Sequence, residues 1–185
     1  MIGLIVIDMQ REYSSEGALP VERFDDAVGN VKLLLEAARQ SENTVVVKVR
    51  HVSRKPGDSS FDAGSPNLVF IEGLEPRPGE FVLTKHYPGA FSNPELERFL
   101  TRHDVDTLVV CGFTSIWCCD TTAREGFQLG YKVYYVEDAT SEFALGDLSA
   151  DDLHRASNAV QGSAFSEVVS TSTAASLLRS GKPAV

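Results

Sequence analysis

Three polar side chains of kinds that catalyse hydrolysis follow apolar stretches of this 185-residue chain. Asp8 comes directly after the run IGLIVI, Lys85 ends the segment EFVLTK, and Cys118 lies six residues after the glycine that closes DTLVVCG. A thiol must lose its proton before it attacks a carbonyl carbon, a nearby ammonium stabilises the thiolate, and a carboxylate can take the proton. The three residue types together fit nucleophilic catalysis by a cysteine.

Each of these residues also has a structural explanation when it is taken alone. Asp8 could cap a turn, and Lys85 could be a solvated surface lysine. A cysteine in apolar surroundings usually packs as a small hydrophobic residue. The functional interpretation therefore depends on whether the fold brings the three side chains together.

Apolar residues alternate along the chain between short continuous runs, which are typical of buried strands, and stripes with helical spacing. We expect strands at 2–7, 44–49, 80–85, 106–112, 131–138 and 166–171, and helices at 24–38, 93–100, 118–130, 149–160 and 172–180. Residues 51–80 are rich in Gly, Pro, Ser and Asp without a clear period, and are predicted to form a long loop.

This alternation predicts an α/β fold with three αβα layers, Rossmann-like, in which helices cover both faces of a six-stranded, mainly parallel sheet. Residues 1–185 are expected to form a single domain. In open sheets of this class, ligands bind beyond the carboxyl ends of the strands, where the strand order reverses. With the order 3-2-1-4-5-6, the first and fourth strands are neighbours there, and Asp8 and Cys118 would share one crevice.

Composition limits the classes of partner. The net charge of −9 argues against a nucleic-acid or anionic-membrane surface, because both require basic patches. No run approaches the roughly 20 apolar residues of a membrane span. The N-terminal MIGLIVIDMQ has no basic region and is interpreted as a strand, not a signal peptide. Three cysteines, two of them adjacent, form a poor disulfide framework, so we expect free thiols in the cytoplasm.

The chain resembles the isochorismatase-like cysteine hydrolase family, which includes nicotinamidases and N-carbamoylsarcosine amidase. The resemblance rests on LIVIDMQREY, VLTKHYPGAFSNPELERFL and TLVVCGFTSIWCCDTTAREGFQLGYKVYYVEDAT, which occur in the family's order. It implies that Asp8, Lys85 and Cys118 are the catalytic triad. It also implies a cis peptide bond between Phe113 and Thr114, and an oxyanion hole made by the backbone amides of Thr114 and Cys118.

Two adjacent cysteines compete for the role of nucleophile. The family's nucleophile lies six residues after the glycine of its G-x-x-T-x-x-C stretch, and counting from Gly112 selects Cys118. If Cys118 stands at a helix start, its side chain can face the crevice, while that of Cys119 is turned by about 100°. The stripe on the sheet side is then Cys119, Thr122, Ala123 and Gly126. A helix start and the Lys85 ammonium would lower the pKa of the Cys118 thiol, with the Asp8 carboxylate opposing them, so that the proton could instead be shared between Asp8 and Cys118 as a coupled pair.

The segment after the second strand departs from nicotinamidases of the family, which hold a metal with an Asp-x-His stretch and further histidines. Here the segment reads VKVRHVSRKPGDSSFD, in which Lys48 or Arg50 stands near the Asp position and only His51 remains. A metal site needs more ligands than one histidine. We therefore predict no metal and no other cofactor, and we do not favour ordinary nicotinamidase activity.

Departures next to the nucleophile put the substrate in doubt, because Ile116 stands where the family commonly has Asp and Ser115 stands for its Thr. Several aromatic and basic residues could line the pocket, although core packing or a surface position explains each of them equally well. The candidate substrate-binding residues are Tyr13, Arg50, His51, Tyr87, Phe91 and Trp117, with Phe61 and Arg54 as further possibilities.

The resemblance implies a metal-independent cysteine hydrolase that cleaves a C–N bond of a small amide or ureido compound through a thioester. One alternative is an isochorismatase-type vinyl-ether hydrolase, but such enzymes need no thiol, and Cys118 argues against it. Another is a catalytically idle binding or assembly subunit, against which the intact triad argues. Besides a small-molecule substrate, the resemblance implies a second copy of the chain as partner, in a dimer or tetramer.

Overall fold

The computed structural model describes residues 1–181, in which strands and helices alternate in the predicted order. The strands are β1 (Ile2–Ile7), β2 (Thr44–His51), β3 (Phe81–Lys85), β4 (Thr107–Phe113), β5 (Lys132–Ser141) and β6 (Glu167–Val169). The helices are α1 (Phe24–Arg39), α2 (Glu95–Arg102), α3 (Asp120–Gln128), α4 (Ala150–Val160) and α5 (Thr171–Ser180). Within residues 1–181 no helix has both the length and the hydropathy needed to cross a membrane.

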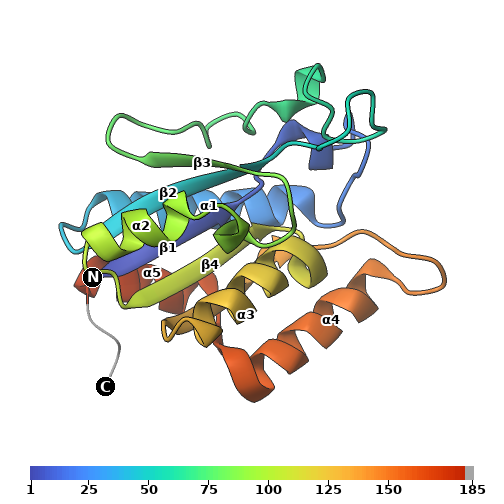
Figure 1. Ribbon diagram of the computed structural model, residues 1–185. Coiled ribbons are helices and arrows are strands. Elements are labelled where there is room, and N and C mark those ends of the chain that lie inside the picture. Colours follow the sequence, from blue (N-terminus) through green and yellow to red (C-terminus); the bar gives the residue numbers. More distant parts are fainter. Residues whose placement is uncertain (182–185) are drawn as a thin grey trace.

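The six strands form one parallel sheet in the order β3-β2-β1-β4-β5-β6, which confirms the predicted fold class and strand order. Helices α1 and α5 lie on one face, and α2 and α3 lie on the other, with α4 beside α3 (Figure 1). Every residue of β1 is buried, because both faces of this central strand are covered. A continuous apolar run is the sequence pattern that such a strand requires.

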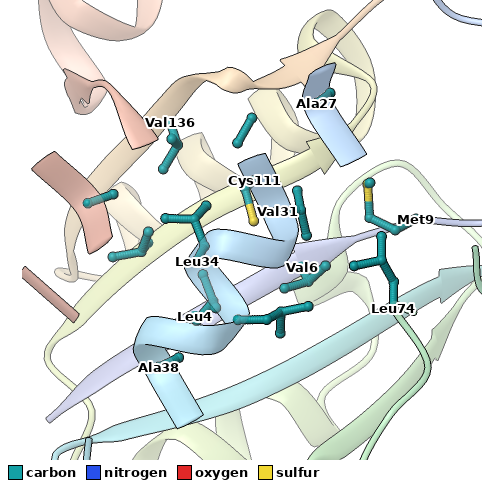
Figure 2. Packing of buried hydrophobic residues seen from close by; sticks show 14 of the residues in the cluster. Leu4, Val6, Met9, Ala27, Val31, Leu34, Ala38, Leu74, Cys111 and Val136 are labelled. Carbon is teal, nitrogen blue, oxygen red and sulfur yellow. The ribbon is translucent and has the colours of Figure 1, made fainter. Parts of the chain in front are cut away.

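Alternate residues of β1 divide the core into two clusters. Leu4 and Val6 pack against Val31 and Leu34 of α1, and Cys111 of β4 belongs to the same cluster (Figure 2). The intervening residues of β1 face the α2 and α3 side. Burial of apolar area on both faces, at about 25 cal/mol per Å², stabilises the packing of the sheet between its helix layers.

The strand order reverses between β1 and β4, and the register there aligns the two segments expected to carry chemistry. Ile7 lies opposite Gly112, so Asp8 and the turn after β4 leave the same edge of the sheet. Gly112 has a φ of +116°, and a Cβ at this position would collide with the carbonyl oxygen of Ile7. Only glycine allows this approach of the two backbones.

Several boundaries differ from the sequence-based expectation, and two of them concern the segments that carry the predicted site. Strand β2 continues to His51 because Arg50 and His51 pair with Thr84 and Lys85 of β3. The expected helix start at position 118 is wrong: a π-helical turn over Ser115–Cys119 precedes α3. The predicted 51–80 loop has little regular structure, apart from a single 3-10 turn and an antiparallel bridge from Phe70 to Gln10.

A second lysine is buried on the α1 side of the sheet, away from the site predicted from sequence. Lys48 alternates with Val47 and Val49, which face the α2 and α3 side, and it is fully buried. Its Nζ has no hydrogen-bond partner among residues 1–181. Burial lowers the pKa of Lys48 to about 8, although the nearby carboxylate of Glu80 opposes the shift.

We expect Lys48→Met to stabilise the fold. A lysine pKa of about 8 in the folded state, against 10.5 in the unfolded state, means that the charged form destabilises the fold below pH 8, on the order of 3 kcal/mol. The penalty disappears as the pH rises from 8 to 10.5. Thermal unfolding at pH 7 should show a higher Tm for Lys48→Met, with Lys55→Met in the exposed loop as the control. A Tm below that of the wild type would contradict this account.

Candidate active site

Asp8 enters the site through an unusual backbone conformation. It follows β1 with a φ of +47°, a region that Asp adopts more readily than most residues. Its amide donates to the carbonyl of Val49 at 2.9 Å, and its carbonyl accepts from the amide of Gln10 at 2.7 Å. The fully buried side chain forms an ion pair in which Oδ2 lies 2.7 Å from Nζ of Lys85.

Lys85 connects the triad. It is the last residue of β3, is 1% exposed, and directs Nζ toward the switch point of the sheet. Besides Asp8, its ammonium donates to Sγ of Cys118 at 3.1 Å and lies 3.1 Å from Nδ1 of His51. The structure therefore brings the three predicted catalytic side chains together around one buried ammonium.

Cys118 lies inside the π-helical turn and is 7% exposed. Its carbonyl accepts a hydrogen bond from Oγ1 of Thr122 at 2.7 Å. The same Thr122 hydroxyl accepts from the amide of Ala90 at 3.0 Å, which connects the turn to the loop after Lys85. Cys119 is fully buried, and the expected sheet-side stripe of Cys119, Thr122, Ala123 and Gly126 is buried throughout. The peptide bond between Phe113 and Thr114 is cis.

A carboxylate that the sequence did not single out holds the start of this turn. Glu142, just beyond β5, is 1% exposed, and its Oε2 accepts from Oγ of Ser115 at 3.2 Å and from the amide of Ile116 at 2.9 Å. Oε1 accepts from the amide of Phe143 at 3.1 Å. The sequence offered one signal for Glu142, namely an acidic residue directly after β5, the strand that pairs with β4.

Burial and charge keep the proton on sulfur in the resting site. Burial, together with the Asp8 carboxylate, raises the pKa of Cys118 to about 12, and the Lys85 ammonium offsets this only in part. Burial likewise raises the pKa of Asp8 against the attraction of Lys85. For Lys85, burial would lower the pKa, but Asp8 and Cys118 raise it above its usual value. The expectation of a lowered thiol pKa is therefore wrong for the resting state.

The candidate pocket residues separate into three groups. His51 contacts the triad through Lys85. Tyr13 is buried behind the site, with its ring edge-on to Phe61 and Phe113 at centroid distances of 5.3 and 5.4 Å. In the third group, Tyr87 and Trp117 are 49% and 45% exposed, and Phe91 packs on Tyr131.

The side chain of Arg50 is directed at Thr84 and at a cavity that is separate from the triad. Its Nε donates to Oγ1 of Thr84 at 2.8 Å, and it lines a cavity of about 870 Å³ with Arg11 and Phe24. None of the triad residues lines this cavity. Arg54 lies over the ring of Tyr87, with 4.8 Å from the guanidinium carbon to the ring centroid.

The donor set beside His51 does not fit a metal ion. Within residues 1–181 there is no group of three His, Cys, Asp or Glu side chains that could hold one. Nδ1 of His51 already contacts the ammonium of Lys85, and a cation there opposes a second cation. Lys48, near the position of the missing Asp, is buried on the opposite face of the sheet.

Removal of one charge at a time should distinguish the effects of Asp8 and Lys85 on the reactivity of the Cys118 thiol. Asp8→Asn removes a carboxylate that raises the pKa of Cys118 and leaves Lys85 beside the sulfur. We expect iodoacetamide to alkylate Cys118 at least about tenfold faster at neutral pH, which corresponds to one pKa unit, while Lys85→Met slows alkylation. Time-resolved mass spectrometry of the peptide that also holds Cys119 supplies an internal control. Alkylation no faster in Asp8→Asn than in wild type would show that the carboxylate does not hold the proton on sulfur.

Comparison with known proteins identifies the family of the chain. The sequence-family model of the isochorismatase domain matches residues 3–173 of the chain. The chain is 32% identical to the secreted isochorismatase effector Isc1 of Verticillium dahliae, over 91% of this chain and 87% of that protein. It is 31% identical to nicotinamidase 3 of Arabidopsis thaliana, over 76% and 73% of the two chains.

Two further similarities concern amide chemistry and cysteine chemistry. Ureidoacrylate amidohydrolase RutB of Pantoea ananatis is 28% identical, over 75% of this chain and 68% of that protein. The crystal structure of a cysteine hydrolase from Pseudomonas syringae pv. phaseolicola superimposes with a TM-score of 0.88 at 30% identity, covering 98% and 93% of the two chains. The chain is thus a hydrolase of the isochorismatase family.

Proposed function

We propose that the protein is a metal-independent cysteine hydrolase that cleaves a C–N bond of a small amide or ureido compound through a thioester. The observation that carries the proposal is the position of Nζ of Lys85, 2.7 Å from Oδ2 of Asp8 and 3.1 Å from Sγ of Cys118. Nicotinamidase 3 and ureidoacrylate amidohydrolase, by their names, support C–N bond cleavage.

Acylation begins from a protonated thiol, because the pKa of Cys118 is about 12. As Sγ attacks the carbonyl carbon, its proton passes to Asp8, whose raised pKa makes the carboxylate a better base than a solvated one. The carbonyl oxygen takes the negative charge, which the amides of Thr114 and Cys118 would stabilise as an oxyanion hole. The C–N bond then breaks, Asp8 returns the proton to the leaving nitrogen, and a thioester remains on Cys118.

Deacylation reuses the same carboxylate. Water donates a proton to Asp8 while its oxygen attacks the thioester carbon, and the C–S bond breaks. The sulfur leaves as a thiolate beside the Lys85 ammonium and recovers the proton from Asp8. The products are an amine or ammonia, a carboxylic or carbamic acid, and the free thiol, so one difficult step is divided into two easier ones.

Vinyl-ether hydrolysis is the second candidate, favoured by the similarity to the isochorismatase effector Isc1. That reaction needs an acid to protonate the substrate but no nucleophilic sulfur. It gives no role to the contact between Lys85 and Cys118. A catalytically idle assembly subunit would likewise have no use for a buried ammonium held between a carboxylate and a thiol.

Self-association is part of the proposal. It rests on the resemblance to the family, whose members commonly associate. The expected state is a dimer or tetramer.

Substitution of the two adjacent cysteines should give opposite results. Cys118→Ala is expected to abolish hydrolysis of the amide and ureido substrates of a screening panel, whereas Cys119→Ala keeps most of the activity because Cys119 packs in the core. Intact-protein mass spectrometry after acid quench should find an acyl adduct on Cys118 only. Full activity in Cys118→Ala would reject the thioester and favour vinyl-ether hydrolysis.

Chelators are expected to leave the activity unchanged, because the residues beside His51 do not supply the ligands that a metal requires. The measurement is the hydrolysis rate before and after dialysis against EDTA, combined with elemental analysis of the purified protein. Stoichiometric zinc or iron, with activity lost on its removal and recovered on its return, would overturn the metal-independent mechanism.

A further inference from the structure

The Lys85 ammonium has three protons and three acceptors. Two acceptors, Asp8 and Cys118, belong to the proposed chemistry, and the third is Nδ1 of His51 at 3.1 Å. His51 is the last residue of β2 and lies beside Lys85 in the parallel pairing with β3. The proposed proton transfers between Cys118, Asp8 and the substrate do not involve this histidine.

The contact fixes the protonation state of the ring. An ammonium can only donate, so Nδ1 of His51 must carry a lone pair, and the single ring proton of the neutral imidazole must be on Nε2. The charges around the ring favour this form. Burial lowers the pKa of His51 to about 4, with the ammonium of Lys85 and the nearby His86 acting in the same direction. His51 is therefore a neutral acceptor at physiological pH.

Several contacts hold the ring in place. Gln10 binds both backbone groups of His51: its Oε1 accepts from the His51 amide at 2.7 Å, and its Nε2 donates to the His51 carbonyl at 3.1 Å. The ring of Phe61 meets the imidazole edge-on at 4.9 Å between centroids. Phe61 is in turn held by Glu12, a buried carboxylate whose Oε1 accepts from the Phe61 amide at 3.1 Å.

We propose that His51 is a positioning residue, whose Nδ1 accepts the third proton of Lys85 and so directs the other two protons at Asp8 and Cys118. Neutrality is essential to this role. A carboxylate in the same place would compete with the developing thiolate for the ammonium, whereas a neutral imidazole takes a hydrogen bond and leaves the charge available. A buried ammonium proton without an acceptor would also be costly.

The protonation state can be measured without any knowledge of the substrate. Nitrogen-15 NMR of the histidine-labelled full chain distinguishes the protonated from the unprotonated ring nitrogen at pH 8, and His51→Gln assigns the His51 signals. We expect His51 to be neutral with its proton on Nε2. His86 and His103 are internal controls with the opposite tautomer, because Nδ1 of each lies 2.8 Å from a backbone carbonyl, which can only accept.

Removal of the donor should release the ring. In Lys85→Met, where Nδ1 loses its partner and a neighbouring cation is gone, the pKa of His51 should rise and its tautomer preference weaken, while the nitrogen signals of His103 stay unchanged. A His51 that is charged at pH 8, that carries its proton on Nδ1, or that does not respond to Lys85→Met would overturn the proposal.

The kinetic arm rests on the proposed function. His51→Leu should lower kcat by about tenfold or more with little change in KM, because the ammonium loses an acceptor. His51→Gln, whose amide oxygen can accept, should recover part of the loss, and His86→Gln is the surface control. Equal kcat in His51→Leu and wild type would reject the role. If no panel substrate is hydrolysed, the hydrolase proposal fails, and the NMR result still decides whether His51 holds Lys85.

Discussion

The buried ammonium of Lys85 is the constraint on which the arrangement of the site depends. Moving an ion out of water costs several kcal/mol unless partners with good geometry replace the lost solvent. Here three chain segments supply those partners: the turn after β1, the end of β2 and the π turn after β4. They meet only because β2, β1 and β4 are consecutive in the sheet and run parallel beside β3. The strand order and the stability of the charge therefore depend on each other.

One ammonium cannot stabilise two anions equally, and this explains why the resting thiol keeps its proton. The carboxylate of Asp8 lies nearer to Nζ than the sulfur does, and burial penalises a second anion. The backbone amides at the start of the π turn do little to stabilise a thiolate, because the amide of Ile116 already donates a hydrogen bond to the carboxylate of Glu142. In a site of this kind the resting cysteine is a protonated thiol and not a thiolate. It transfers a proton from sulfur to carboxylate only when an electrophilic carbon is in position to take the sulfur's electron pair.

The strands were predictable because continuous apolar runs leave little choice for a sheet covered on both faces, and the strand order then placed Asp8 beside the turn that carries Cys118. The π turn was not predictable, since no local propensity distinguishes Ser115–Cys119 from a late helix start. Glu142 and Gln10 act through tertiary contacts with backbone groups distant in sequence, which no spacing rule shows. Arg50 was misleading for a related reason, because the extension of β2 directs its side chain to Thr84.

Lys48 and Lys85 show that burial of a lysine does not by itself identify a functional site. Both are buried almost completely, on neighbouring strands, yet the pKa of Lys48 is lowered to about 8 while that of Lys85 is raised. For Lys48, burial dominates, because no acceptor reaches its Nζ among residues 1–181. For Lys85, Asp8 reverses the effect of burial and keeps the charge. The hydrogen-bond acceptors around each ammonium, and not the lysine itself, cause this difference. Three acceptors keep Lys85 charged and hold its ammonium in a fixed position for chemistry. Lys48 has no such acceptors within the described part of the chain, and its buried ammonium loses its proton more readily.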